Sequence, residues 1–327
     1  MTTRRQLIGG ATAAGVLGMG AMPSFAQSRA DTVRLVIGFA PGGTADAIAR
    51  RVADRLRGQL APNVVVENKV GAGGQIAISY VKDSPPDGNT ILMTPSSCLS
   101  VYPFTYPNKL PYKVSDLAAV STVGFFDYGF GIGPAVPETV KTMKDFLAWT
   151  RANPTKGNYG SPAPGSMPHM LVAYIAKLNN LPWTHVPYRG AAPGVQDLLG
   201  GNISGMSASI GDFLPHLKSG RLRVLAVSSA TRNRFAPDIP SYRSQGIPIN
   251  MREWYGLFLP AAASASVQRR TAAYVQTALA NPDIVSSMDS VALDVKSSTT
   301  DEVTALLRAD SQEWGRLIKL IGFNAET

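Results

Sequence analysis

The stretch over residues 33–74 constrains the fold of this chain more than any other segment. An apolar run over 33–39 predicts a buried strand, a Pro-Gly-Gly turn follows it, and apolar residues at helical spacing begin at Ala45. A second short strand then leads into a glycine-rich loop over 68–74 and a helix over 75–81. Two glycine loops therefore each end a strand and open a helix.

Helix N-termini of this kind are suited to binding anions. The first turn of a helix leaves backbone N–H groups unpaired and carries about half a positive charge. Two such termini facing one crevice would hold a small organic anion without a metal. The sequence therefore predicts a protein that binds an anion and does no chemistry on it, and we expect no cofactor. The alternative interpretation of Gly42 and Gly43 is that of turn glycines that only supply positive φ angles.

The composition is that of a globular protein, with 45% hydrophobic and 16% charged residues. The formal net charge of +9 would permit nucleic acid, an anionic surface or an anionic ligand as a partner. The basic residues are scattered rather than gathered into a stripe, so we expect no nucleic-acid partner. None of the three histidines has a partner at metal-ligand spacing, so we expect no metal. The single cysteine, Cys98, is interpreted as a small buried hydrophobic residue.

The N-terminus is typical of a secretory signal peptide. Arg4 and Arg5 precede an apolar run over 7–22, and residues 24–26 (Ser-Phe-Ala) offer a small-x-small cleavage pattern. We therefore expect residues 1–26 to be removed by cleavage after about Ala26, and we expect a periplasmic location. The paired arginines also fit a twin-arginine signal, so the sequence leaves the export route open.

Strands and helices alternate along most of the chain, which predicts an α/β fold with mainly parallel sheets flanked by helices. The C-terminal part is too short for a domain of its own and is expected to complete the first sheet. The chain would then cross twice between two lobes, near Val123 and near Ser228, and the two crossings would form a hinge. We expect residues 27–123 and 229–327 in lobe 1 and residues 124–228 in lobe 2. The crevice between such lobes is where α/β folds bind ligands.

An ordered set of motifs resembles the Bug, or TctC-like, substrate-binding proteins of tripartite tricarboxylate transporters. Each motif alone is weak, but the series is specific and runs through nearly the whole chain after the signal peptide. The motifs are Phe39-Ala40-Pro41-Gly42-Gly43-x-x-Asp46, Val66-Glu67-Asn68 with Gly71-Ala72-Gly73-Gly74, Pro86-Asp87-Gly88, Asn158-Tyr159-Gly160-Ser161, Gly165-Ser166 with His169, Val186-Pro187-Tyr188-Arg189-Gly190, Asp197-Leu198-Leu199-Gly200-Gly201, the run 219–227, and Trp254-Tyr255-Gly256.

The resemblance implies a periplasmic binding protein, similar to type II, whose two lobes close over a small carboxylate. It implies the membrane permease subunits of such a transporter as partners, and a ligand-binding sensor without a transport role is the alternative. We expect a monomer. By the resemblance, glycine and polar residues from both lobes bind the ligand: Phe39, Ala40, Gly42, Gly43, Thr44, Asp46, Gly73, Gly74, Ser96, Ser161, Gly165, Ser166, His169, Tyr188 and Arg189.

Some of these side chains have a second interpretation. Asp46 either ties the N–H groups of its own loop or meets an ammonium group on an amino-acid ligand. Arg189 is either the cation for a carboxylate, because its planar guanidinium binds carboxylates with two hydrogen bonds, or an exposed arginine. Ser161 with His169 would permit a periplasmic serine hydrolase, although the chain has no Gly-x-Ser-x-Gly motif. The sequence does not name the carboxylate.

The chain departs from the family pattern after the Asp-Leu-Leu-Gly-Gly motif. Residues 204–205 are Ser-Gly at a place where the family often has an acidic residue. The following run, 206–211, lacks the usual acidic residue before its proline loop, although Asp212 is close. The departure concerns the part of the site expected to meet the polar end of the ligand.

Overall fold

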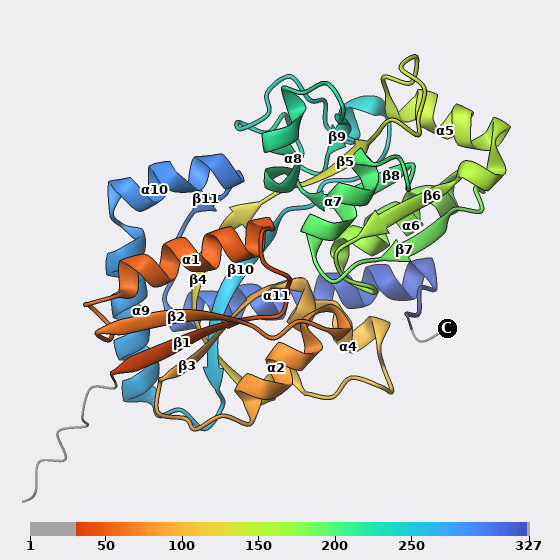
Figure 1. The fold of residues 1–327 in the computed structure, drawn as a ribbon. Helices are drawn as coiled ribbons and strands as arrows, with labels where there is room; N and C mark the ends of the chain where they lie inside the picture. Colours follow the sequence, from red (N-terminus) through yellow and green to blue (C-terminus); the bar gives the residue numbers. More distant parts are fainter. Residues whose placement is uncertain (1–30, 326–327) are drawn as a thin grey trace, which may run out of the picture.

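The computed structural model describes residues 31–325, which form two α/β lobes joined by two crossing segments (Figure 1). The expected signal peptide and its cleavage site lie outside the described residues. Within the described part of the chain, no helix combines the length and apolar character needed to cross a bilayer.

Lobe 1 contains a six-stranded sheet in the order β11-β4-β10-β3-β1-β2. The two parallel pairs join β1 to β2 and β1 to β3, and the other neighbours run antiparallel. The strands are β1 (Thr32–Ile37), β2 (Asn63–Asn68), β3 (Thr90–Pro95), β4 (Leu117–Phe126), β10 (Glu253–Pro260) and β11 (Asp294–Val295).

Lobe 2 contains a five-stranded sheet in the order β7-β6-β8-β5-β9. Strand β6 is parallel to both of its neighbours, whereas β5 is antiparallel to both of its own. The strands are β5 (Tyr128–Ile132), β6 (Asn158–Ser161), β7 (Thr184–Pro187), β8 (Gly205–Ser209) and β9 (Arg223–Val227).

Both sheets are therefore mixed, and the expectation of mainly parallel sheets is wrong in that detail. The reason lies in the crossings between lobes. Strand β10 returns from lobe 2 and enters the first sheet antiparallel, between β3 and β4. Strand β5 continues from β4 into the second sheet and pairs antiparallel with β8 and β9. A strand that crosses between lobes does not arrive through a helix, so the rule for parallel pairing does not apply to it.

Helices cover both sheets. In lobe 1 they are α1 (Thr44–Leu56), α2 (Gln75–Lys82), α3 (Ser97–Ser100), α4 (Tyr102–Thr105), α9 (Ala265–Leu279), α10 (Pro282–Met288) and α11 (Thr300–Ile321), and in lobe 2 they are α5 (Met143–Ala152), α6 (Met167–Leu178), α7 (Ala191–Leu199) and α8 (Ile210–Leu217). Short 3₁₀ turns are η1 (Ala72–Gly74), η2 (Val114–Asp116), η3 (Pro154–Lys156), η4 (Arg243–Gln245) and η5 (Asp289–Val291).

The chain passes between the sheets at Asp127 and again just before Glu253. Strand β4 pairs with β10 as far as Phe126, so Val123 lies inside the first sheet and the first crossing comes after it. After β9, the chain stays against lobe 2, because the Tyr242 N–H donates to the Val227 carbonyl at 3.0 Å. The second crossing therefore comes well after Ser228 in the sequence, just before Glu253.

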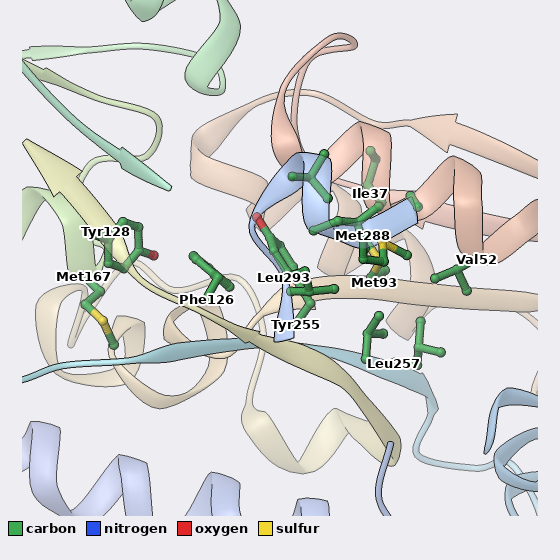
Figure 2. Packing of buried hydrophobic residues seen from close by; sticks show 14 of the residues in the cluster. Ile37, Val52, Met93, Phe126, Tyr128, Met167, Tyr255, Leu257, Met288 and Leu293 are labelled. Atoms are coloured by element: carbon green, nitrogen blue, oxygen red, sulfur yellow. The ribbon is translucent and has the colours of Figure 1, made fainter. Parts of the chain in front are cut away.

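One hydrophobic core extends from lobe 1 through the first crossing into lobe 2 (Figure 2). Ile37 and Met93 belong to the lobe 1 end of this cluster, and Phe126 and Tyr128 continue it along the crossing strand toward Met167. The rings of Phe126 and Tyr128 meet edge to face, with centroids 5.3 Å apart. The two lobes thus share a packed junction at the place where the chain passes between them.

Candidate functional site

The N-terminus of α1 lies against lobe 2, and two glycines precede it. Gly42 has a φ of +92°, which side-chain-bearing residues rarely adopt, so this turn needs glycine. Gly43 is the N-cap residue in an extended conformation (φ −88°), and no side chain caps the helix from that position. Two hydrogen bonds join this segment to lobe 2: the Ala40 N–H to the Arg189 carbonyl at 3.1 Å, and the Thr44 N–H to Asp212 Oδ1 at 2.7 Å.

Asp46 holds the glycine loop before α1 in place by hydrogen bonds, which is one of its two expected roles. Its Oδ2 accepts from the Gly42 N–H at 3.1 Å, and its carboxylate also accepts two hydrogen bonds from Arg50 and one from Asn68. Burial raises the pKa of Asp46, but the hydrogen bonds from Arg50 and Asn68 outweigh it and hold the pKa below its usual value. The hydrogen bonds of the Asp46 carboxylate are thus all made within its own lobe.

The second glycine loop, residues 71–74, packs behind the first glycine loop. The two loops do not face one crevice together. Residues 71–74 all have positive φ angles, which brings this backbone against β1. A Cβ on Gly38 would lie 2.4 Å from the Gly74 Cα, so the two loops are in direct backbone contact. The Gly73 carbonyl accepts from the Tyr102 hydroxyl at 2.8 Å. Gly73 and Gly74 therefore stand behind Phe39 rather than in the wall of the cavity.

A cavity of about 40 Å³ lies between the lobes at the start of α1. Space of this size holds a few waters at most, since a single water needs roughly 10–15 Å³. Most of its walls are apolar or aromatic, and its polar groups are hydroxyls and one carboxylate. The walls are formed by Phe39, Ala40, Gly43, Thr44, Ala45, Pro95, Ser97, Cys98, Phe126, Tyr128, Pro162, Ala163, Ser166, Pro168, Ala191, Ser209, Asp212 and Tyr255.

Two hydroxyls in these walls have no hydrogen-bond partner. They are Thr44 Oγ1, at the first position of α1, and Ser97 Oγ, at the first position of α3. Thr44 is 4% exposed and Ser97 is 1% exposed, so water does not reach them freely. A buried hydroxyl without a partner costs about 1–3 kcal/mol, which a bound guest would recover.

Asp212 reaches the cavity from α8 of lobe 2 and is half-buried there. Burial raises the pKa of this carboxyl to about 6, and hydrogen bonds from the Thr44 and Ser209 backbones partly oppose that rise. The Thr44 hydroxyl also lies near the carboxylate and lowers its pKa, although its geometry does not make a hydrogen bond. A carboxylate at a helix N-terminus is stabilised by the helix dipole. Asp212 is therefore an anion of the protein itself at the start of α1.

Glu253 lies fully buried behind the cavity, at the first residue of β10. It accepts from the Ser97 N–H at 2.6 Å and from the Tyr128 hydroxyl. Burial raises the pKa of its carboxyl to about 7. Ser96 is also fully buried, and its hydroxyl faces Glu253 at 3.5 Å rather than the cavity. Glu253 thus links α3 of lobe 1 to the first residue of β5.

Tyr188 and Arg189 lie outside the cavity walls. The Tyr188 hydroxyl donates to Asp197 within lobe 2 at 2.7 Å, and burial raises the pKa of Tyr188 above its usual range. Arg189 contributes its backbone carbonyl to the contact with Ala40, while its side chain is exposed. In this arrangement the Arg189 guanidinium does not meet a guest in the cavity.

Ser161 pairs with a different histidine from the one that sequence reasoning paired it with. Its hydroxyl lies 2.8 Å from His185 Nε2 and is fully buried. His185 stacks on His169 with ring centroids 3.6 Å apart. Burial lowers the pKa of His169 to about 3 and that of His185 to about 4, so both rings are neutral at pH 7. Ser161 has neither the access nor the His169 contact that the hydrolase hypothesis assumed.

The loop over 162–166 fastens lobe 2 to lobe 1. Thr105 donates to the Gly165 carbonyl at 3.1 Å, and the Tyr106 hydroxyl donates to the Pro164 carbonyl at 2.8 Å. The Gly165 N–H in turn donates to His169 Nδ1 at 2.9 Å. Ser166 lines the cavity, but its hydroxyl donates to the Ala163 carbonyl instead of capping α6. His169 therefore holds the loop shape and stays out of the walls.

The structure brings five of the expected residues into one cavity wall: Phe39, Ala40, Gly43, Thr44 and Ser166. The others stand behind that wall or beside it: Gly42, Asp46, Gly73, Gly74, Ser96, Ser161, Gly165, His169, Tyr188 and Arg189. That either group binds a ligand stays a prediction.

Sequence reasoning missed Ser97, Ser209 and the aromatic residues of the wall. The aromatics Phe126, Tyr128 and Tyr255 lie on β4, β5 and β10 beside the crossings, and no sequence pattern assigned them to the site. From the sequence, Asp212 stands out only as a residue close to a family departure, and an aspartate in a first helical turn also serves the helix dipole. Whether such an aspartate serves its own helix or a ligand site depends on what packs against that helix in the fold.

Neither a metal nor a reactive thiol emerges from the described residues. No cluster of three or more His, Cys, Asp or Glu side chains in residues 31–325 is arranged to hold a metal ion. Cys98 is buried, and burial raises the pKa of its thiol to about 12, which keeps it protonated. The interpretation of Cys98 as a buried hydrophobic residue is confirmed.

Solved structures share this arrangement of two lobes. The structure of a periplasmic transporter is 29% identical and has a TM-score of 0.84, covering 90% of this chain and 98% of that one. MatC from Rhodopseudomonas palustris with bound malate is 23% identical, with a TM-score of 0.81, covering 88% and 98%. R. palustris Rpa4515 with adipate is 24% identical, with a TM-score of 0.84, covering 90% and 98%. The fold is therefore that of a two-lobed periplasmic binding protein.

Sequence comparison places the chain within one family of that class. Residues 48–323 match the model of TctC, the tripartite tricarboxylate transporter family receptor, and the chain belongs to this family. A UPF0065 protein in the tcbD-tcbE intergenic region of Pseudomonas sp. (strain P51) is 31% identical over 292 residues, covering 89% of this chain and 86% of that protein. Protein BugT of Bordetella pertussis is 27% identical over 292 residues, covering 89% of both. The family resemblance read from the motifs is confirmed.

Proposed function

We propose that this protein captures a small carboxylate between its two lobes and delivers it to the permease subunits of a tripartite tricarboxylate-type transporter. The observation that carries the proposal is the cavity at the N-terminus of α1. Its walls come from both lobes and include two buried hydroxyls, Thr44 Oγ1 and Ser97 Oγ, that have no partner. A carboxylate accepts hydrogen bonds at both oxygens, and a helix N-terminus favours its charge.

The carboxylates bound by related folds support this ligand class. MatC holds malate and Rpa4515 holds adipate, and both have the same two-lobed fold. The cavity here is smaller than an organic acid requires, so we propose that the lobes part to admit the ligand. The contacts between Ala40 and Arg189 and between Tyr106 and Pro164 would then break on opening and re-form on closure.

We place the hinge at the two crossings, at Asp127 and at 250–252. Arg252 Nε lies 2.9 Å from Asp127 Oδ1, and Arg252 also pairs with Asp294. This ion pair joins one crossing directly to the other, so it would keep the two segments together while each lobe moves as a body. The lobe boundaries that go with this hinge are 31–126 with 253–325, and 128–249.

We further propose that the chain is exported to the periplasm and cleaved after about Ala26. Mass spectrometry of the protein recovered from a periplasmic fraction tests this directly. A mature N-terminus at Gln27 is the expected result, and recovery of the intact Met1 terminus in the cytoplasm would contradict it.

Two alternatives differ in what happens after binding. A sensor would bind the same ligand at the same cavity but would not depend on a permease. Uptake of the ligand, measured in cells with and without the permease genes, distinguishes the two. The hydrolase alternative rests on the hydrogen bond between Ser161 and His185. Ser161 is 0% exposed, so a substrate would need a rearrangement of lobe 2 to reach it.

Thermal unfolding of the mature chain with a panel of mono- and dicarboxylates tests the proposed function. A ligand present at about a hundred times its dissociation constant should add about 2.7 kcal/mol to the free energy of unfolding. A stabilisation by at least one carboxylate supports the proposal. If no member of a broad panel shifts the transition, the proposal fails.

A further inference from the structure

Asp212 gives the cavity a negative charge of its own. It is the one charged residue that lines the cavity in the part of the chain that the structure describes. It comes from α8 of lobe 2 and accepts from the Thr44 N–H of lobe 1 at 2.7 Å. Every ligand that enters between the lobes at this point therefore meets this carboxylate.

Asp212 forms no ion pair within the described chain, although Arg51 and His216 line a neighbouring cavity that Asp212 also reaches. None of the groups that shift its pKa is basic, and no Lys, Arg or His is in the cavity wall. With a pKa of about 6, the carboxyl is mostly ionised at pH 7. A guest that carries only carboxylate groups would place a second negative charge beside it in a site with little water. Like charges that close cannot both be accommodated without a proton or a cation between them.

The remaining walls also suit a positively charged group. Phe39, Phe126, Tyr128 and Tyr255 supply aromatic surface around the cavity. The Phe126 and Tyr255 rings stack with their centroids 4.6 Å apart. The faces of aromatic rings attract ammonium groups, and the attraction grows where water is excluded. A carboxylate group, by contrast, is not attracted to the negative faces of the rings.

We propose that Asp212 selects ligands that carry an ammonium group next to their carboxylate, which makes the substrate an amino acid. Asp212 holds the ammonium group, while the Thr44 and Ser97 hydroxyls take the carboxylate of the same molecule. The ammonium group then neutralises Asp212, and the ligand carboxylate accepts hydrogen bonds from neutral hydroxyls. This inference rests on the proposed function, since it names the class of carboxylate that the cavity takes.

Matched pairs of ligands test it in the wild-type protein. Isothermal titration calorimetry at pH 7.5 would compare alanine with propionate, aspartate with succinate, leucine with 4-methylpentanoate and phenylalanine with 3-phenylpropionate. The members of each pair differ only by the ammonium group. In at least one pair, the amino acid should bind about tenfold or more tightly than its partner, a difference of about 1.4 kcal/mol. Equal binding in every pair that binds, or tighter binding of the unsubstituted acid, overturns the inference.

The variant Asp212→Asn assigns the preference to this residue. It keeps the size of the side chain and removes its charge, so the amino acid should lose about tenfold or more in affinity. The unsubstituted acid should bind as before or more tightly. Asp238→Asn is the matched control, because Asp238 is an exposed aspartate of lobe 2 outside the cavity wall, and its loss should leave the ratio unchanged. Asp212→Ser repeats the test if the asparagine variant unfolds.

The outcomes separate the inference from the function on which it rests. If amino acids and plain acids both bind and the ratio is the same in wild type and Asp212→Asn, the protein is a carboxylate binder and the role of Asp212 is wrong. If no compound of either set binds the folded wild-type protein, the proposed function fails as well. A ratio that falls toward one only in the Asp212 variants supports the inference.

Discussion

Asp212 of lobe 2 accepts a hydrogen bond from the Thr44 backbone N–H of lobe 1 at 2.7 Å, so a carboxylate of the protein lies at the start of α1. The same N–H group belongs to the helix terminus where sequence reasoning expected a ligand anion. Thr44 also has an unpartnered hydroxyl in the cavity wall. The two residues therefore make this helix terminus a meeting point of the two lobes.

A bulky residue at Gly43 should block the cavity without unfolding lobe 1. A Cβ there would lie 3.5 Å from Asp212 Oδ1 and 3.7 Å from the Ala192 nitrogen, which is ordinary contact. Gly43→Ala should therefore retain ligand-induced stabilisation, whereas Gly43→Leu should lose it, because its further atoms need the space that lobe 2 fills. The backbone conformation suits any residue, so the free energy of unfolding without ligand should change by less than about 1 kcal/mol. Ligand shifts in Gly43→Leu equal to those of wild type would contradict this account.

Loss of Asp46 should loosen the first loop. Asp46→Ala removes a buried carboxylate together with its four hydrogen bonds, from Gly42, Arg50 and Asn68. We expect a loss of about 1–3 kcal/mol in the free energy of unfolding, measured by urea denaturation. Asp54→Ala on the exposed face of the same helix is the control, since its ion pair with Arg57 is solvent-exposed and should contribute less than about 1 kcal/mol. Similar losses in both variants would show that Asp46 has no special role.

Glu253 should make the protein less stable as the pH rises. Its pKa is about 7 in the folded state and 4.5 ordinarily, so the folded state holds the proton more tightly. Its contribution to stability is therefore complete below about pH 4.5 and is lost as the pH rises through 7. From pH 5 to pH 8 this amounts to about 2 kcal/mol for this residue.

The comparison of wild type with Glu253→Gln isolates that effect. Asp212, with a raised pKa, acts in the same direction. His169 and His185, with lowered pKa values, act in the opposite direction, because their unfolded forms take up protons below about pH 6.5. All three remain in both proteins. The difference in unfolding free energy between wild type and variant should fall as the pH rises from 5 to 8, and a constant difference would refute the assignment.

Ser161 should be dispensable for binding. Its hydroxyl is fully buried against His185, away from the cavity wall. Ser161→Ala should cost about 1 kcal/mol of stability, as expected for one lost buried hydrogen bond, and should leave the dissociation constant of the ligand unchanged. Calorimetry on the variant measures both quantities. Loss of ester hydrolysis in this variant, from a measurable wild-type rate, would revive the hydrolase alternative.

The periodic parts of the chain could be predicted from their residues. The apolar spacing over 300–321 predicts the helix that is α11. Thr142 is a residue type that caps helices, and at the start of α5 its hydroxyl accepts from the Asp145 N–H at 3.1 Å. Local rules decide these elements, since apolar spacing and a capping side chain lie within a few residues of one another. The strand–loop–helix unit that ends in α1 follows from the same rules.

The strands β5 and β8 were missed because glycine and other small residues interrupt their strand patterns. Strand β5 reads Tyr-Gly-Phe-Gly-Ile, and its glycines make room for a helix residue: a Cβ on Gly131 would lie 2.8 Å from the Phe213 ring. Strand β8 reads Gly-Met-Ser-Ala-Ser. Both are fully buried, where tertiary packing overrides strand propensity. The same limit applies to the site, since Asp212 and Thr44 are 168 residues apart and meet only in the folded chain.

The crystal structure of the mature protein with its tightest-binding carboxylate tests the central claim most directly. The account predicts the guest between the lobes, with its carboxylate on the Thr44 and Ser97 hydroxyls and its ammonium group within hydrogen-bond distance of Asp212. The account would be contradicted by a guest bound elsewhere while the cavity at α1 stays empty. The groove beside α11, lined by Leu99, Phe258 and Leu307, is one such place.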